Sequence, residues 1–346
     1  MSILIAIIIF SLIIIFHEFG HFIVAKKNGI RVEEFCLGLG PTLFGFTKGE
    51  TKYSLHLLPF GGACVMTGED GDSDDERAFV NKGVWTRIAV VFAGPGFNFL
   101  LAFLLALIMI ACIGYDEPVV TYVTEDGAAR AAGMEDGDRI ISLDGDRIFV
   151  YREISNYLYL HPQKVTKEIK VVYERDGQKY ETSIQPSYDE ETGRYLLGFQ
   201  RDGKRSHAGP LKVLAYSLYE VKYWIQITVD SLGMMLQGQV SANDISGPVG
   251  IVSTIGDTYQ KSAAISYFAV FINMLNISIL LSANLGVMNL LPIPALDGGR
   301  LLFLIIELIR GKRADPEKEG MVHFAGLMLL LGLMVLVMFH DIVNLL

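Results

Sequence analysis

Three stretches of this 346-residue chain are almost free of charge and long enough to cross a bilayer as helices. Ile88–Ile113 and Ser262–Leu296 contain no charged residue, and Met321–Phe339 contains one ionisable residue, His323. Ile3–Ala25 is a fourth apolar stretch. Its start carries none of the basic residues of a cleaved signal peptide, so we expect it to be retained. Because a helix of ~20 apolar residues spans the hydrocarbon core, the sequence predicts a polytopic α-helical membrane protein with about four transmembrane helices.

The positions of lysine and arginine predict how these helices are oriented. Basic residues gather after the first span, before the second and after the third. By the positive-inside rule, residues 26–87 and 310–318 are then cytoplasmic, and both termini and the long insert after the second span lie outside. The residues behind this prediction are Lys26, Lys27, Arg31, Lys82, Arg87, Arg310, Lys312 and Arg313.

Composition along the chain divides it into four predicted parts. We expect an N-terminal membrane part at 1–114, a polar domain at 115–205, amphipathic linker helices at 206–262 and a C-terminal membrane part at 263–346. The N-terminal part holds spans at about 3–25 and 88–113, with a re-entrant β-like loop at about 32–66 between them. The C-terminal part holds spans at about 268–291 and 321–341.

Charge and cysteine content exclude several functions. The net charge of −9 is spread along the chain without a basic stripe, so no nucleic-acid partner is expected. Cys36, Cys64 and Cys112 are isolated residues, so neither a disulfide framework nor a thiolate metal site is expected. The acidic run Gly68–Glu76 is interpreted as a solvated cytoplasmic loop, and a metal-binding role is the alternative.

The polar domain shows the element order of a small α/β module. A strand, a short helix, a strand pair turning at an Asp-Gly step, a second helix and a hairpin turning at Asp176-Gly177 follow one another. This order, and the block "GAARAAGMEDGDRIISLDG", resemble a bacterial PDZ domain. The resemblance implies a peptide-binding loop at "LLGF", which here ends the domain as in circularly permuted members; its residues are Leu196, Leu197, Gly198 and Phe199. The alternative is a spacer that binds nothing.

The linker contains the aromatic-rich segment "LKVLAYSLYEVKYWIQITVDSLGMML", which predicts a helix. Its tyrosines, tryptophan and Lys212 and Lys222 would suit the membrane surface. An ordinary helix packed on the spans is the alternative.

The first span carries the pattern of a metal site. His17 and His21 are four residues apart, so on a helix both imidazoles leave one face and can bind one cation. Glu18 can reach water at that cation without being a ligand, as a general base must. Because ionisable groups inside a bilayer are costly, we expect these three residues to serve chemistry.

A third metal ligand is expected from a distant part of the chain. Hydrolytic zinc sites use three protein ligands and leave a fourth position open. Asp297, in "NLLPIPALDGGR", follows a charge-free run of 35 residues and precedes Arg310 by 13 residues, while His17 precedes Lys26 by nine. Both sites therefore lie inside the same predicted membrane boundary. The prolines and glycines around Asp297 predict a broken helix, which is tolerated at membrane depth where it lines a cavity.

These motifs, taken in order, resemble a known family. "HEFGH" at His17–His21, "AGPGFN" at Ala93–Asn98, the PDZ-like insert, "SGPVGI" at Ser246–Ile251 and "NLLPIPALDGG" resemble the bacterial site-2 proteases of the RseP/RasP type. The resemblance implies one Zn²⁺ per chain held by His17, His21 and Asp297, with Glu18 as catalytic base. It also implies Asn289 as a catalytic amide near the substrate or the developing oxyanion.

The resemblance also implies a biological setting. Substrates would be single-span membrane proteins or signal-peptide remnants in the lipid bilayer, among them anti-sigma factors and pheromone precursors, cut after trimming by an upstream site-1 protease. The PDZ-like domain would act outside the cell as a size filter. The chain would lie in a bacterial cell membrane with its active site toward the cytoplasm.

The loop "TKYSLHLLPFGGACVMTG" is predicted to bind unwound substrate. Its apolar segments, broken by Pro59 and glycines, indicate a re-entrant β-like loop whose edge could pair with an extended peptide. The alternative is a hairpin that plugs the cytoplasmic mouth. The substrate-binding residues expected here are Tyr53, Ser54, Leu55, His56, Leu57, Gly61 and Gly62.

Two other functions are compatible with parts of the sequence. A membrane-anchored PDZ scaffold would need no Glu18. A metal transporter could use His17, His21 and Asp297 as a transit site, but transporters usually contain repeated halves, and none is visible in the sequence.

Overall fold

The computed structural model describes residues 2–69, 71–161, 164–190, 193–207, 209–239, 247–313 and 315–345. Ser246, the first residue of the "SGPVGI" motif, and Asp70 of the acidic run lie outside them. The chain forms two compact units: a helical unit made of Met1–Leu105 and Val240–Leu346, and an insert unit made of Ala106–Gln239.

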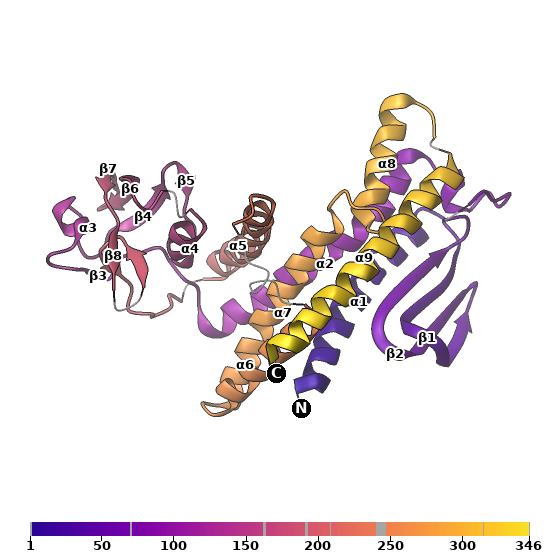
Figure 1. Cartoon of the computed structure of the whole chain (residues 1–346), viewed down its shortest axis with the longest axis horizontal. Coiled ribbons are helices and arrows are strands. Elements are labelled where there is room, and N and C mark those ends of the chain that lie inside the picture. The colour runs from indigo at the N-terminus through magenta and orange to yellow at the C-terminus, as the bar shows by residue number, and fades with distance from the viewer. Residues whose placement is uncertain are drawn as a thin grey trace. The chain divides into compact units, whose positions relative to one another are not determined.

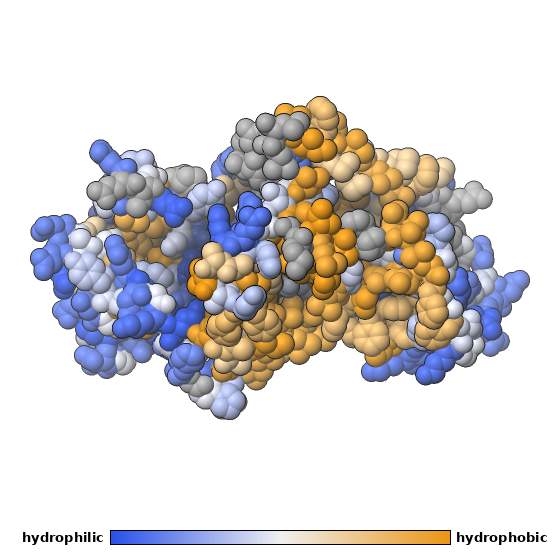
Figure 2. Space-filling view, turned by 90° about the horizontal axis from the view of Figure 1, so that it is seen from below, coloured by the Kyte–Doolittle hydropathy of each residue, from blue (hydrophilic) through white to orange (hydrophobic). Residues whose placement is uncertain are grey.

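The predicted multi-pass helical architecture is confirmed. The long helices are α1 (Ser2–Lys27), α2 (Val84–Ile113), α7 (Tyr267–Asn289) and α9 (Pro316–Leu345). Each contains an apolar stretch long enough to cross a membrane. None of the 18-residue hydrophobic window of α9 is buried inside the protein, so this helix exposes a largely apolar surface. Figure 2 shows hydrophobic residues dominating the visible face of the helical unit, while hydrophilic residues cover much of the insert unit.

Two shorter helices complete the helical unit. α6 (Pro248–Ala263) precedes α7, and α8 (Asp297–Arg310) follows it after a turn rich in proline. The third span therefore ends at Asn289, and the "LDGG" motif begins a separate helix. Pro292 and Pro294 explain the break, because proline has no N–H to continue the helical ladder.

Small residues allow helices α1 and α2 to come very close. A Cβ atom on Gly20 of α1 would overlap the carbonyl oxygen of Ala93 in α2 and lie 3.0 Å from Phe97 Cβ. In a bilayer, helix association depends on such packing, because lipid tails are as apolar as the side chains. Gly20 therefore sets the close approach of the two helices next to the histidines.

A β-sheet packs against α1 and follows it in sequence (Figure 1). It consists of β1 (Val32–Lys48) and β2 (Thr51–Met66), and a short 3-10 helix, η1 (Phe79–Asn81), follows before α2. Both strands bend, so that each pairs twice with the other. Phe35 pairs with both Tyr53 and Cys64, and Tyr53 pairs with both Phe35 and Phe46.

The double pairing makes a sheet of four segments in the order 42–48, 51–57, 32–39 and 61–66. The segment 51–57 is internal, with partners on both sides, so it cannot offer the open edge expected at Tyr53–Leu57. The segment 61–66 is paired on one side with β1 and forms an edge. Of the residues predicted to form the edge, Gly61 and Gly62 lie on the edge segment and Tyr53–Leu57 lie on the internal one, because single residues do not reveal that a strand folds back on its partner.

Glu50 fixes the β1–β2 turn to the end of α1. It forms ion pairs with Arg77 at 2.6 Å and with Lys26 at 2.6 Å. Hydrogen bonds from Arg77 and Lys26 lower the pKa of Glu50 to about 2. In the acidic run that follows, Asp75 accepts a hydrogen bond from Arg31 at 2.9 Å. These ion pairs hold the sheet in place beside the metal-site motif of α1.

The insert unit contains the predicted small α/β domain. Its four-stranded sheet has the order β5-β4-β6-β7, and the predicted hairpin turns at Asp176-Gly177, both with positive φ. β10 pairs antiparallel with β3, which joins the end of the domain to its beginning. The strands are β3 (Tyr122–Val123), β4 (Arg139–Leu143), β5 (Asp146–Arg147), β6 (Ile169–Arg175), β7 (Gln178–Ile184), β8 (Ser187–Asp189), β9 (Arg194–Leu196) and β10 (Phe199–Gln200), and the helices are α3 (Ala128–Ala131), α4 (Arg152–Leu160) and α5 (Pro210–Leu236).

The aromatic-rich linker helix α5 packs its polar face on α4 of the same unit. Arg152 pairs with buried Glu220, and the Asn156 side chain donates to the Tyr223 hydroxyl at 2.7 Å. The opposite face remains apolar and exposed, at Leu211, Leu214, Leu218 and Leu236. That this helix lies on the membrane surface stays a prediction.

We predict that Asp341 of α9 stabilises the helical unit by capping α6. Its two carboxylate oxygens accept the backbone N–H groups of Gly247 at 2.9 Å and Gly250 at 2.8 Å. Asp341→Ala removes both acceptors and should cost about 1 kcal/mol of stability, the usual loss for a helix N-cap. The measurement is the thermal unfolding midpoint of the detergent-solubilised protein. Val343→Ala, at an exposed position of the same helix, is the control; equal midpoints for the two variants would contradict the capping role.

Candidate active site

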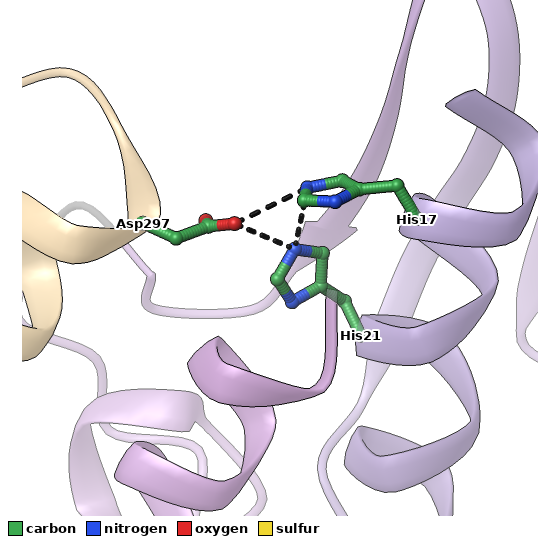
Figure 3. A group of neighbouring side chains, drawn as sticks. All are labelled: His17, His21 and Asp297. Carbon is green, nitrogen blue, oxygen red and sulfur yellow. Dashed lines mark hydrogen bonds and ion pairs between the residues drawn. The ribbon is translucent and has the colours of Figure 1, made fainter. Parts of the chain in front are cut away.

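Three predicted ligands from two distant segments meet in the helical unit (Figure 3). His17 and His21 leave the same face of α1, and Asp297 is the first residue of α8. His17 Nε2 lies 3.2 Å from Asp297 Oδ2, His21 Nε2 lies 3.5 Å from it, and the two Nε2 atoms are 3.2 Å apart. Both histidines are buried, at 9% and 8% exposure.

The spacing of these three atoms fits a divalent cation. Zinc ligands at about 2.0–2.1 Å in a tetrahedron are about 3.3 Å from one another, close to the distances found here. Asp297 Oδ2 is buried and makes no hydrogen bond within the described chain. Three such atoms facing one another repel unless a cation or protons lie between them. Within the described residues, no other group of His, Cys, Asp and Glu comes together in this way, including the acidic run.

The segment before Asp297 is held by contacts with α9. Ala295 has φ +77°, which is unusual for alanine, and its N–H donates to His323 Nδ1 at 2.9 Å. Gly326 of α9 approaches Pro294 so closely that a Cβ atom would overlap it. His323, the single ionisable residue of the apolar stretch Met321–Phe339, thus contacts the turn that precedes Asp297.

The side of the histidines away from Asp297 faces α2. His21 Nδ1 lies 2.8 Å from the Val90 carbonyl, and His17 Nδ1 lies 3.2 Å from Asn98 Nδ2. Between them, Gly94 leaves the room that both imidazoles occupy, since a Cβ there would overlap His21 Nε2 and lie 2.7 Å from His17 Cε1. A bulkier residue at Gly94 would therefore displace both rings.

A cavity of 430 Å³ opens beside the three ligands. Glu18 borders it, together with the edge segment of the sheet and Asn289. A Cβ on Gly62 would lie 3.0 Å from Glu18 Cγ, so this glycine lets the edge segment pass directly over the glutamate. The cavity thus brings together Glu18, the three convergent atoms and the edge segment of the sheet, whose Met66 N–H donates to Glu69 at 3.3 Å.

The predicted substrate-binding residues separate into two groups. Gly62 borders the cavity, and Gly61, at φ +86°, packs against Leu39. The remaining five lie on the internal segment, where Ser54 donates to Glu34 at 2.6 Å and lies 3.1 Å from His56 Nε2. The cavity lining does not include those five, which are Tyr53, Ser54, Leu55, His56 and Leu57.

Asn289, the expected catalytic amide, lies at the end of α7. It borders the cavity, and its Nδ2 is 3.5 Å from His17 Nδ1. It therefore reaches both the open space and the site's first histidine.

In the insert unit, two of the three leucine and phenylalanine side chains of the "LLGF" segment are buried. Leu197 and Phe199 are buried in the domain core, and Gly198, at φ +84°, packs over the start of α3. Leu196 borders a separate hollow of 530 Å³ that α4 also lines. Of the four residues expected to contact a peptide, only Leu196 lies along that hollow.

Sequence reasoning did not identify all the residues that support the site. It included Asn98 only as part of the "AGPGFN" motif, and it gave no role to Val90 or His323 and none to Gly94 beyond that motif. A signal was available, because residues 90, 94 and 98 share a helix face at i, i+4, i+8 spacing. What it could not show is that this face lies against the histidines.

The chain is similar in sequence to a known protein family and to individual proteins. The family model described as peptidase family M50 matches residues 5–333. A putative zinc metalloprotease of Clostridium acetobutylicum is 37% identical over 99% of this chain and 97% of its own length. The regulator of sigma-W protease RasP of Bacillus subtilis is 30% identical over 97% of each. A solved PDZ domain of an SdrC-like protein from Listeria monocytogenes aligns at 24% identity over 25% of this chain and 90% of that one, with a TM-score of 0.22.

We predict that Gly94→Ala weakens zinc binding by at least about 10-fold, the lower end of the loss seen when supporting groups of a metal site are disturbed. The added methyl group would push the imidazoles of His17 and His21 apart. Zinc affinity of the purified protein would be measured by competition with a chelator. Gly96→Ala is the matched control, because its Cβ would meet nothing closer than Phe92 Cε1 at 3.5 Å. Unchanged affinity in Gly94→Ala would show that the site does not need this space.

Proposed function

Since the chain belongs to peptidase family M50, the site-2 type of zinc metalloprotease, we propose that it hydrolyses peptide bonds within or near the transmembrane segments of single-span proteins. The observation that carries the proposal is the convergence of His17, His21 and Asp297 beside Glu18, among helices apolar enough to cross a membrane. A water-using reaction there needs a polar cavity at membrane depth. The 430 Å³ cavity supports this requirement.

The donor set suits one zinc ion per chain. Two imidazole nitrogens and one carboxylate oxygen are the ligands of many catalytic zinc sites. When bound by His17, His21 and Asp297, zinc would supply Lewis acidity that polarises a peptide carbonyl and acidifies water. The fourth side of the site faces the cavity, where a substrate can enter.

Glu18 is the proposed general base. It borders the cavity but is not one of the three convergent ligands. Its carboxylate would take a proton from the attacking water and deliver it to the leaving amine, so that one group serves both proton transfers. Asn289, at the cavity wall, would direct its amide N–H toward the oxygen that gains charge in the tetrahedral intermediate.

The edge segment 61–66 is the proposed site for unwound substrate. A helical substrate hides its peptide bonds in its own hydrogen-bond ladder, so the bond to be cut must be extended first. An extended peptide can add to a sheet edge through main-chain hydrogen bonds. The edge formed by Gly62, Ala63, Cys64, Val65 and Met66 borders the cavity, which would bring such a peptide next to Glu18.

The substrate class and the cellular setting complete the proposal. The Bacillus subtilis relative is named as a regulator of sigma-W. That name supports anti-sigma factors as one substrate class, beside signal-peptide remnants and pheromone precursors. The PDZ-like insert would act as an external size filter that admits substrates trimmed by an upstream protease. The site would face the cytoplasmic side of a bacterial cell membrane.

We predict that Glu18→Gln lowers cleavage by at least about 100-fold, the usual minimum contribution of general acid–base catalysis. The assay uses purified protein in detergent and a single-span substrate without its ectodomain, with product masses measured to locate the cut. Chelation should abolish cleavage and zinc should restore it. Glu33→Gln is the matched control, because Glu33 is exposed, accepts a hydrogen bond from Thr67 and does not line the cavity. Persistent cleavage in Glu18→Gln would rule out the proposed base.

We predict that the substrate lies along residue 65 and not along residue 55. Val65 and Leu55 are equally exposed, at 40% and 42%, but only Val65 is on the open edge. Each would be replaced by cysteine in a Glu18→Gln protein without native cysteines, and tested for disulfide crosslinks to single-cysteine substrates. Crosslinks at position 65 that recur at every second substrate residue would match strand pairing. Equal crosslinking at both positions would favour the alternative of a hairpin that plugs the mouth.

A further inference from the structure

Helix α2 supports both histidines through one narrow face. Val90, Gly94 and Asn98 are spaced four residues apart, so they lie one above another on the helix. Val90 meets the far nitrogen of His21, Gly94 leaves room for the rings, and Asn98 meets the far nitrogen of His17. Asn98 is the only one of the three that contributes a polar side chain.

Asn98 is buried completely, at 0% exposure, within Ile88–Ile113, the charge-free stretch of α2. An amide in such a place is costly unless it is hydrogen-bonded. Ser282 of α7 donates to the backbone oxygen of Asn98 at 2.7 Å and leaves the carboxamide for other partners. The carboxamide Oδ1 is buried and has no hydrogen-bond partner among the described residues.

The partner of the carboxamide is His17 Nδ1, and its role depends on which ring nitrogen carries the proton. If His17 Nε2 binds a metal, the neutral ring carries its proton on Nδ1, which must then donate. The nearest Asn98 atom is Nδ2, at 3.2 Å, which is itself a donor. Turning the carboxamide by 180° places Oδ1 at that position and gives the Nδ1–H an acceptor. Without metal, the present orientation suits the other tautomer, whose Nε2–H faces Asp297 Oδ2 at 3.2 Å.

His21 also needs a hydrogen-bond acceptor for its Nδ1–H, and a backbone carbonyl supplies it. The Val90 carbonyl, 2.8 Å from His21 Nδ1, can only accept a hydrogen bond, so it holds His21 with its proton on Nδ1 and leaves Nε2 free. His17 has no backbone carbonyl in this role among the hydrogen bonds described. Asn289 also approaches His17 Nδ1, but at 3.5 Å and from the cavity wall.

We propose that Asn98 is a positioning residue of the zinc site: its carboxamide oxygen accepts the Nδ1–H of His17 and so keeps Nε2 directed at the metal. The inference rests on the proposed function, because it requires His17 to be a zinc ligand. An amide can also donate, so it accommodates His17 both with and without metal. A carboxylate at this position would hold only the tautomer that binds metal.

The test compares three variants of the full-length protein in detergent. Asn98→Leu keeps the approximate shape and removes the acceptor, while Asn98→Asp keeps an acceptor that cannot turn away. Ser282→Ala is the control, since the Ser282 hydroxyl donates to the backbone oxygen of Asn98 and not to its carboxamide. The readout is the zinc dissociation constant by competition with a chelator. Thermal unfolding with excess chelator reports whether each variant is folded without metal.

The expected result is a loss of 10- to 100-fold in zinc affinity for Asn98→Leu, as for other groups that hydrogen-bond a metal-bound histidine. Asn98→Asp should stay within about threefold of the original protein or bind more tightly, because carboxylates serve this role in other zinc sites. Wild-type affinity in Asn98→Leu would overturn the inference, as would an equal loss in Asn98→Asp and Asn98→Leu, which would indicate a purely structural role. If the wild-type protein binds no zinc, the proposed function is overturned and this inference with it.

Discussion

The structure depends on holding three electron-rich atoms together inside an apolar helical unit. His17 Nε2, His21 Nε2 and Asp297 Oδ2 lie 3.2–3.5 Å apart, a spacing that is unfavourable without a positive charge between them. Burial of both histidines weakens the screening of this repulsion by water. The surrounding segments must therefore hold each side chain through contacts on the side that faces away from the other two.

Three kinds of contact supply this support, and each comes from a different element. The close approach of α1 and α2 at Gly20 and Gly94 places a carbonyl and an amide behind the imidazoles. The turn before α8 delivers Asp297 and is held by His323 of α9. On the open side, Gly62 lets the sheet edge reach Glu18 without a side chain in the way. The site is thus enclosed on its helical side and borders the cavity on its sheet side.

Several features of the site could be predicted because they depend on local spacing. The i, i+4 pair His17 and His21 must share a helix face, and the spacing of Asp297 from Arg310 predicted that it lies within the same membrane boundary as the histidines. The edge strand could not be predicted in the same way. Whether Tyr53 or Val65 is at the edge depends on β1 and β2 folding back on each other, which is a long-range pairing. The same holds for "LLGF", where the pattern did not show that Leu197 and Phe199 enter the core.

The sequence by itself determined the four apolar helices, the hairpin at Asp176-Gly177 and the choice of His17, Glu18, His21 and Asp297 as candidate site residues. These follow from hydrophobic length, helical periodicity and turn chemistry, which act over a few residues. Only the tertiary structure decided which strand is open, and that Val90, Gly94 and Asn98 lie behind the histidines. Both outcomes depend on packing between segments distant in sequence. The helix contact, for example, requires Gly20 of α1 to lie against α2, which the sequence of neither helix shows alone.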